Sequence, residues 1–210
     1  MGKPSLILIG AGGHAISCID VIEQQAQFQI AGLVGQLGEQ QSDRLGYPVF
    51  AGDDDLPRLA AKYTHALIAI GQIASPAQRM QIYYQLIKLG FKLPTVIAPT
   101  AIVSKHAVVE AGSIIMHGAI VNAGARIGRN CIINTRALIE HGVVVNDHCH
   151  IATGATLNGN VVVGEGTFVG SGSIVKEGIL IGQSCIVGMG LTIRHNVISG
   201  TRFTGERVSE

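Results

Sequence analysis

The chain of 210 residues has no tryptophan, few other aromatic residues and little charge. Charged side chains make up 14% of it, against about a quarter in an average domain. The 15 Lys and Arg nearly balance the 14 Asp and Glu, so no excess of basic residues exists to attract a nucleic acid or an anionic membrane. No apolar run approaches the ~20 residues of a membrane-spanning helix. We therefore expect neither a nucleic acid nor a membrane as a partner.

Cysteine is also scarce. The four cysteines are widely spaced and form no C-x-x-C motif, so they cannot supply the disulfide framework of a small secreted domain. The aliphatic run at residues 6–9 is too short for the apolar region of a signal peptide, and no cleavage site follows it. A cytoplasmic protein is the expectation.

What the chain does have is aliphatic residues and glycine. Hydrophobic residues make up 47% of it, and 28 residues are Gly, well above the usual share of about 7%. Such a chain is too apolar to be disordered. With so few aromatic residues, this composition favours a repetitive structure over an ordinary globular core.

The first part of the chain, residues 1–98, alternates strand and helix signals. Short aliphatic runs bounded by glycine are typical of buried parallel strands; they occupy residues 6–9, 30–34 and 66–70. Apolar residues at helical spacing occupy residues 14–27 and 75–89. Ser75-Pro76 is typical of a helix start and Gly90 of a helix end. The alternation predicts an α/β domain with a small Rossmann-like parallel sheet and right-handed crossovers.

From residue 101 the chain repeats every six residues. In sixteen consecutive hexads the third place is Val, Ile or Leu, from Val103 to Ile193; the first place is mostly small, and the sixth is Gly or Asn in twelve. Each hexad predicts one short strand and one bend, and three hexads close a triangular coil. The first and third residues would point inward, and coils must stack to bury them. The bend requires a positive φ, which glycine adopts freely.

This repeat resembles the hexapeptide-repeat acyltransferases, whose fold is an all-β left-handed parallel β-helix. An α/β domain with the turn Gly10–His14 after its first strand and Gly71 after a later one makes the whole chain similar to the sialic acid O-acetyltransferase NeuD family. That family includes bacterial N-acetyltransferases of nucleotide-linked 4-amino-4,6-dideoxy sugars. The resemblance implies a nucleotide-sugar-binding domain at residues 1–98 and an acetyltransferase domain at residues 99–210. It also implies a homotrimer with active sites between subunits.

The activity that the resemblance implies is direct transfer of an acetyl group from acetyl-CoA to the sugar amine, in bacterial surface glycan biosynthesis, with no metal required. A histidine base would serve an amine or a hydroxyl equally. O-acetylation of sialic acid or a related sugar is therefore the alternative.

The catalytic residues follow from one segment. The family's general base stands in an Ile-Glu-His context, nine residues before a second histidine, and here these are His141 and His150. An imidazole, with a pKa near 6.5, can accept a proton at neutral pH. The resemblance assigns His150 to the acetyl-CoA thioester and places Asn134 near the reacting centre. Glu140 is grouped with them as a catalytic candidate.

This chain departs from the family beside the base. Relatives often carry a carboxylate directly after it, but here Gly142 follows. Glu140 or Asp147 could substitute, although successive strand side chains point apart, which argues against a direct bond from Glu140. His148 has no family counterpart and is expected to face solvent.

The resemblance also suggests binding residues. Backbone contacts to acetyl-CoA fall on Ser171, Gly172, Gly188, Met189 and Gly190, although bend geometry explains these glycines equally well. Glycines between a strand and a helix let backbone N–H groups approach a phosphate, which gives the nucleotide-sugar candidates Gly12, Gly13, His14, Gly35 and Gly71. A tight turn without a ligand is the alternative. Relatives acting on UDP-sugars carry acidic residues where this chain has Val34-Gly35-Gln36, so the base stays open.

Other interpretations fit less well. Cys131, Cys149 and Cys185 occupy first places on one inner face and are expected to be small core residues rather than catalytic thiols. The γ-type carbonic anhydrases share the helix, but their zinc needs three histidines; His148 and His150 supply two, so no metal ligand is assigned. A non-enzymatic solenoid or ice-binding wall would show outward threonine ladders, which the chain lacks.

Overall fold

The structure, a computed structural model, describes residues 2–36 and 42–204. The chain forms two compact units. The first consists of Met1–Gly71 and Gln78–Pro99, and the second of Gln72–Ala77 and Thr100–Glu210. Within the described ranges, no helix has both the length and the apolar character needed to cross a bilayer.

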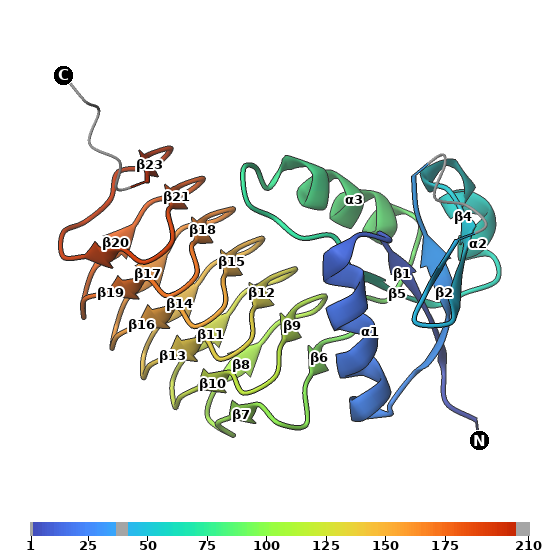
Figure 1. Ribbon diagram of the computed structural model, residues 1–210, viewed down its shortest axis with the longest axis horizontal. Helices are drawn as coiled ribbons and strands as arrows, with labels where there is room; N and C mark the ends of the chain where they lie inside the picture. The colour runs from blue at the N-terminus through green and yellow to red at the C-terminus, as the bar shows by residue number, and fades with distance from the viewer. Residues whose placement is uncertain (1, 37–41, 205–210) are drawn as a thin grey trace. The chain divides into compact units, whose positions relative to one another are not determined.

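The first unit contains a five-stranded sheet in the order β3-β4-β2-β1-β5 (Figure 1). Four strands run parallel: β1 (Ser5–Ile9), β2 (Gln29–Val34), β4 (Tyr47–Ala51) and β5 (His65–Ile68). The two-residue strand β3 (Asp43–Arg44) is antiparallel to β4. The helices are α1 (Gly13–Gln25), the short α2 (Leu56–Ala60) after a 3-10 turn (Asp53–Asp55), and α3 (Ala77–Lys88); β6 (Val96–Ile97) comes last. The predicted α/β class is confirmed.

The helix ends follow the predicted chemistry. The Ser75 hydroxyl accepts the backbone N–H of Ala77 at 3.2 Å, as an N-cap does. After α3, Gly90 takes a φ of +85° and donates its N–H to the carbonyl of Ile87. Strand β4 was missed because Pro48 interrupts it. Pro48 pairs with Asp43 of the two-residue β3, at the margin of the sheet where a missing N–H is tolerated.

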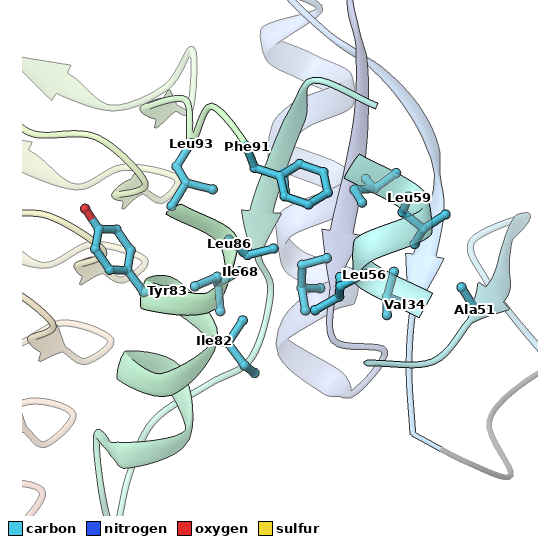
Figure 2. Close-up of a cluster of buried hydrophobic side chains, with 13 residues drawn as sticks. Val34, Ala51, Leu56, Leu59, Ile68, Ile82, Tyr83, Leu86, Phe91 and Leu93 are labelled. Carbon is cyan, nitrogen blue, oxygen red and sulfur yellow. The ribbon is translucent and has the colours of Figure 1, made fainter. Parts of the chain in front are cut away.

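The core of the first unit fills the space between the sheet and α2 and α3. Figure 2 shows Leu56 and Leu59 of α2 and Leu86 of α3 in one buried cluster with Phe91. Ile7 and Ile9 of β1 contribute from the sheet. The aliphatic runs that predict strands therefore supply the apolar surface on which the helices pack.

The second unit is a left-handed parallel β-helix with three faces (Figure 1). Face one contains β7 (Ile102–Val103), β10 (Ile120–Val121), β13 (Leu138–Ile139), β16 (Thr156–Leu157), β19 (Ile174–Val175) and β22 (Thr192–Ile193). Face two contains β8 (Val108–Val109), β11 (Arg126–Ile127), β14 (Val144–Val145), β17 (Val162–Val163) and β20 (Leu180–Ile181). Face three contains β9 (Ile114–Ile115), β12 (Ile132–Ile133), β15 (His150–Ile151), β18 (Phe168–Val169), β21 (Ile186–Val187) and β23 (Arg202–Phe203).

The register confirms the hexad interpretation. Ile102 pairs with Ile120 and Ile120 with Leu138, so one coil takes three hexads. Third-place residues are buried from Ile115 to Ile193. Sixth-place residues all have a positive φ from Gly112 to Gly190, including the five that are not glycine: Asn130, Arg136, His148, Asn160 and Ser184. The backbone of the bend, rather than the identity of its residue, is therefore what the repeat conserves.

Candidate active site

In the first unit, the predicted nucleotide-sugar residues gather at one edge of the sheet. Strand β1 lies between β2 and β5, and all three run parallel, so the segments that follow them share the carboxyl edge. These segments carry Gly12 and Gly13, Gly35, and Gly71. In open α/β sheets this edge is where ligands bind.

The glycine-rich turn after β1 has two different kinds of glycine. Gly10 has a φ of +115°, and a Cβ there would lie 2.5 Å from Cγ1 of Ile70, so the close approach of β1 to the end of β5 demands glycine. A Cβ on Gly12 or Gly13 would meet nothing within 4 Å. Those two glycines leave open space at the start of α1, where N–H groups are unpaired within the helix and the dipole favours an anion.

The other three segments complete this edge. The Cβ of His14 lies 3.6 Å from the position that a Cβ on Gly71 would take, so these two candidates are neighbours. Gly35 is buried, and its N–H donates to the carbonyl of Ala51. The structure therefore brings His14 and Gly71 together, whereas the backbone N–H of Gly35 is engaged within the sheet.

Two arginines that the sequence analysis missed also lie at this edge. Nε of Arg44 donates to the carbonyl of Ala11 at 2.6 Å, which holds a guanidinium beside the glycine-rich turn. The guanidinium of Arg79 is buried and donates to the carbonyl of Ile70 at 2.5 Å. No local motif marks either residue. Only the hairpin of β3 and β4 and the packing of α3 bring them to the turn.

The corners of the β-helix separate the remaining candidates. We call the bends from face one to face two the first corner, those from face two to face three the second, and those from face three to face one the third. His141 and Glu140 follow β13 and lie at the first corner. Asn134 follows β12 and lies at the third corner, beside the face that carries His150.

At the first corner, His141 is exposed and leans over the coil above it. A Cβ on Gly159 would lie 2.7 Å from both Cε1 and Nε2 of the imidazole. The carboxylate of Glu140 accepts the backbone N–H of His141 at 3.2 Å. A Cβ on Gly142 would collide with the side-chain oxygen of Asn160, so the position where relatives carry a carboxylate has no room for one.

At the third corner, Asn134 and His150 belong to one chain of hydrogen bonds. The carbonyl of Gln72 can only accept, so Nδ1 of His150, 2.6 Å away, carries the proton. Oδ1 of Asn134 accepts the backbone N–H of Thr135 at 2.7 Å, which points its NH₂ toward Nε2 of His150 at 3.1 Å. A neutral His150 is then the Nδ1–H tautomer, and its Nε2 accepts rather than donates.

The surroundings hold this histidine in place. His150 is 6% exposed, and its ring meets the edge of Phe168 at a centroid distance of 5.2 Å. Gln72 is 3% exposed and donates from Nε2 to the carbonyl of Gly166 at 3.2 Å, while its Oε1 has no hydrogen-bond partner among the described residues. The segment that carries Gln72 therefore fixes the orientation of His150.

The acetyl-CoA candidates also lie at the third corner, one coil apart. Gly190 donates its N–H to the carbonyl of Ser171 at 2.8 Å, and Gly172 and Gly190 both have a positive φ. Met189 is 80% exposed, and Gly188 donates its N–H to the carbonyl of Phe203. Bend geometry accounts for the two positive-φ glycines. The structure groups all five residues on the same corner as Asn134.

Two expectations at the second corner are wrong. His148 does not face solvent: it is 1% exposed, has a φ of +60°, and its Nδ1 lies 2.9 Å from Nδ2 of Asn130. A buried polar side chain needs such a partner, and the bend turns this one inward. Asp147 does not orient His141, because it accepts the backbone N–H of Arg129 at 2.7 Å and pairs with its guanidinium at 2.7 Å.

The electrostatics of the second corner follow from that pair. Partial burial raises the pKa of Asp147, but the backbone N–H and the guanidinium of Arg129 together outweigh it and hold the pKa below its ordinary value. Among residues 2–36 and 42–204, no group of three or more His, Cys, Asp or Glu is arranged to hold a metal ion.

The cysteine expectation is confirmed. Cys131, Cys149 and Cys185 are fully buried first-place residues. The thiols of Cys131 and Cys149 contact carbonyl oxygens of the neighbouring hexads at 3.1 Å, and burial raises the pKa of Cys149 well above its ordinary value. These thiols are core groups that carry no chemistry.

Comparison with protein families gives three matches. The PglD N-terminal domain matches residues 5–86, the bacterial transferase hexapeptide (six repeats) matches residues 124–159, and the hexapeptide repeat of succinyl-transferase matches residues 160–194. No match was found among curated protein sequences.

Several solved structures are similar along almost the entire chain. PerB from Caulobacter crescentus, in complex with CoA and GDP-perosamine, is 31% identical with a TM-score of 0.87, covering 93% of this chain and 91% of that one. A histidine-to-asparagine variant of perosamine N-acetyltransferase from the same organism, with the same two ligands, is 30% identical with a TM-score of 0.87, covering 93% and 90%. The acetyltransferase domain of PglB from Neisseria gonorrhoeae, in complex with acetyl coenzyme A, is 30% identical with a TM-score of 0.86, covering 95% of each.

Proposed function

The chain belongs to the NeuD-like family of hexapeptide-repeat sugar acetyltransferases, whose acetyl donor is acetyl-CoA, and from this premise we propose that it acetylates the amino group of a nucleotide-linked 4-amino-4,6-dideoxy sugar. Similarity to a perosamine N-acetyltransferase bound to CoA and GDP-perosamine supports an amine as the acceptor. We place the reaction in bacterial surface glycan biosynthesis, in the cytoplasm, where acetyl-CoA is available.

The observation that carries the proposal is the exposed imidazole of His141 at the first corner, held against the surface of Gly159. In the proposed step the sugar amine attacks the thioester carbonyl and His141 accepts the proton that the amine loses. The carbon–sulfur bond then breaks, and the CoA sulfur leaves with a proton. No acyl-enzyme forms. The role of Glu140 is indirect, since its carboxylate fixes the backbone N–H of the base.

We assign the diphosphate of the sugar nucleotide to the carboxyl edge of the sheet in the first unit. Gly12 and Gly13 leave room for it at the start of α1, and His14 and Gly71 are neighbours there. Arg44 adds a positive charge beside the same turn, and an arginine fork suits phosphate oxygens. Gly35 contributes through the end of β2.

The acetyl-CoA arm is assigned to the third corner. Ser171, Gly172, Gly188, Met189 and Gly190 would contact the pantetheine through backbone groups. Asn134 would lie beside the thioester, with His150 holding its amide in place rather than donating to the carbonyl oxygen. This modifies the role that the resemblance implies for His150.

A homotrimer is part of the proposal. His141 and the acetyl-CoA candidates lie on two different corners of one chain, separated by face one. A single cleft lined by both corners therefore needs two chains. Face one also presents exposed apolar side chains outward, among them Ile102, which is 63% exposed, and Ile174, as expected of a surface that a neighbouring subunit covers.

A panel of acceptors tests the proposed reaction. The protein is incubated with acetyl-CoA and UDP-, dTDP- or GDP-linked 4-amino sugars, and with free sialic acid, while CoA release is followed. The matched control is the 4-hydroxy sugar on the same nucleotide. We expect CoA release with one 4-amino sugar nucleotide only. Turnover with sialic acid alone would establish the O-acetyltransferase alternative and contradict the proposal.

A further inference from the structure

The fifth-place residues of alternate coils form a column at the first corner. Ala123, His141, Gly159 and Glu177 follow one another at intervals of one coil. The carbonyl of His141 accepts the N–H of Asn160, and the carbonyl of Gly159 accepts the N–H of Gly178. The column is therefore held rigidly by the backbone. Within it, glycine stands directly above the histidine.

The backbone at Gly159 does not demand glycine. Its φ is outside the positive range that disfavours other residues, unlike that of the sixth-place glycines. Other β-helix glycines with ordinary φ, such as Gly164 and Gly170, occupy fourth places, where a Cβ would meet the backbone of the next coil. At Gly159 the three nearest atoms all belong to the imidazole of His141, at 2.7, 2.7 and 3.4 Å.

We propose that Gly159 is a positioning residue for the general base, the lack of a Cβ providing the surface against which the His141 imidazole lies. The inference rests on the proposed catalytic role of His141. A methyl group at 159 cannot coexist with the ring in its present position, because real Cβ atoms essentially never approach so closely. The ring must tilt away from the corner, and Nε2, one of the two atoms in closest contact, moves with it.

The consequence is a defect in turnover rather than in binding. A displacement of about 1 Å at a reacting group can cost on the order of a hundredfold in rate. For Gly159→Ala we expect kcat to fall by roughly 10- to 100-fold, with both KM values changed by less than about twofold. Ala123→Ser is the matched control: it adds one atom to the same column on the other side of His141, and we expect wild-type kcat.

A double-mutant cycle shows whether Gly159 acts through the histidine. The variants are Gly159→Ala, His141→Ala and the double variant, each checked for folding by thermal melting. We expect Gly159→Ala to cause no further loss once His141 is absent. An equal fractional loss in both backgrounds would overturn the inference.

Rescue by free imidazole provides a second readout that does not need the wild-type ring. In His141→Ala, imidazole added to the buffer should restore part of the activity by lying on Gly159. In the double variant that surface is blocked, and we expect no rescue. Equal rescue in both variants contradicts the inference.

The two levels of the argument fail separately. If His141→Ala retains wild-type turnover, the proposed function of His141 is wrong, and the inference falls with it. If His141→Ala is impaired but Gly159→Ala has wild-type kcat, the inference alone is overturned and the proposed function stands.

Discussion

The side-chain amide of Asn134 donates to Nε2 of His150, and Nδ1 of the same ring donates to the carbonyl of Gln72. Both ring nitrogens therefore have partners supplied by the protein. This arrangement assigns His150 to holding Asn134 rather than to contacting the thioester. It also fixes the tautomer of a buried histidine, which can be measured directly.

Nitrogen-15 NMR of the imidazole should show His150 as the neutral Nδ1–H tautomer at neutral pH, because a carbonyl oxygen can only accept. A predominant Nε2–H form would contradict the assignment. In the matched pair of variants, His150→Gln places an acceptor near the Nε2 position, whereas His150→Asn keeps only a donor near Nδ1. We expect kcat to be higher in the Gln variant, by about tenfold, the scale of a lost hydrogen bond to a buried group.

His141→Ala should lower kcat by about 10²–10⁴-fold, the contribution of a general base. The control is His195→Ala, because His195 is an exposed fifth-place histidine higher on the same corner. We expect wild-type turnover from that control in a CoA-release assay. Similar rates for the two variants would exclude His141 as the base.

Arg44→Ala should weaken binding of the sugar nucleotide without affecting acetyl-CoA. The guanidinium is half-buried and held against the glycine-rich turn by the carbonyl of Ala11. A charge-assisted hydrogen bond to a phosphate contributes about 1.5–3 kcal/mol, and we expect KM for the sugar nucleotide to rise by roughly tenfold at most because of solvent screening. Arg58→Ala, an exposed arginine of α2 paired with Asp55, is the control. Unchanged KM in Arg44→Ala would remove this residue from the site.

All four cysteines should resist a thiol reagent in the native protein. Each is buried, and burial raises the pKa of Cys18 to about 12 despite the opposing charge of Arg79. Because the thiolate is the reactive form, we expect no labelling at pH 8 within the time that denatured protein reacts completely. Rapid labelling of even one native cysteine would show that the β-helix or α1 opens readily.

Asp147→Asn should destabilise the β-helix at neutral pH but not in acid. The native pKa of Asp147 lies below its ordinary value of 3.8, so the folded state favours the charged form. Its contribution is complete above the unfolded pKa and is lost as the pH falls through the native pKa. For a largely exposed pair the expected loss is at most about 1 kcal/mol. Urea unfolding of both proteins at pH 7 and at pH 3 measures it, and the difference should shrink at the lower pH.

Much of the fold is determined locally. The sixteen aliphatic third places and the bends that follow them define a coil of three hexads wherever they occur, because each hexad is specified by its own residues and its nearest neighbours. The same is true of β1, β2 and β5, and of the helix that begins after Ser75 and ends before Gly90. These features needed only periodicity and capping to be predicted. Strand β4, which contains Pro48, lacked such a signal.

The site divides differently. The sequence alone determined that His141 lies in an exposed bend and that glycines follow β1. Only the tertiary structure placed Arg44 beside that turn, turned His148 inward, engaged Asp147 with Arg129, and set the ring of His141 against Gly159. The physical reason is distance along the chain. A side chain's partner one coil away is eighteen residues distant, and no local propensity records what a ring will touch there.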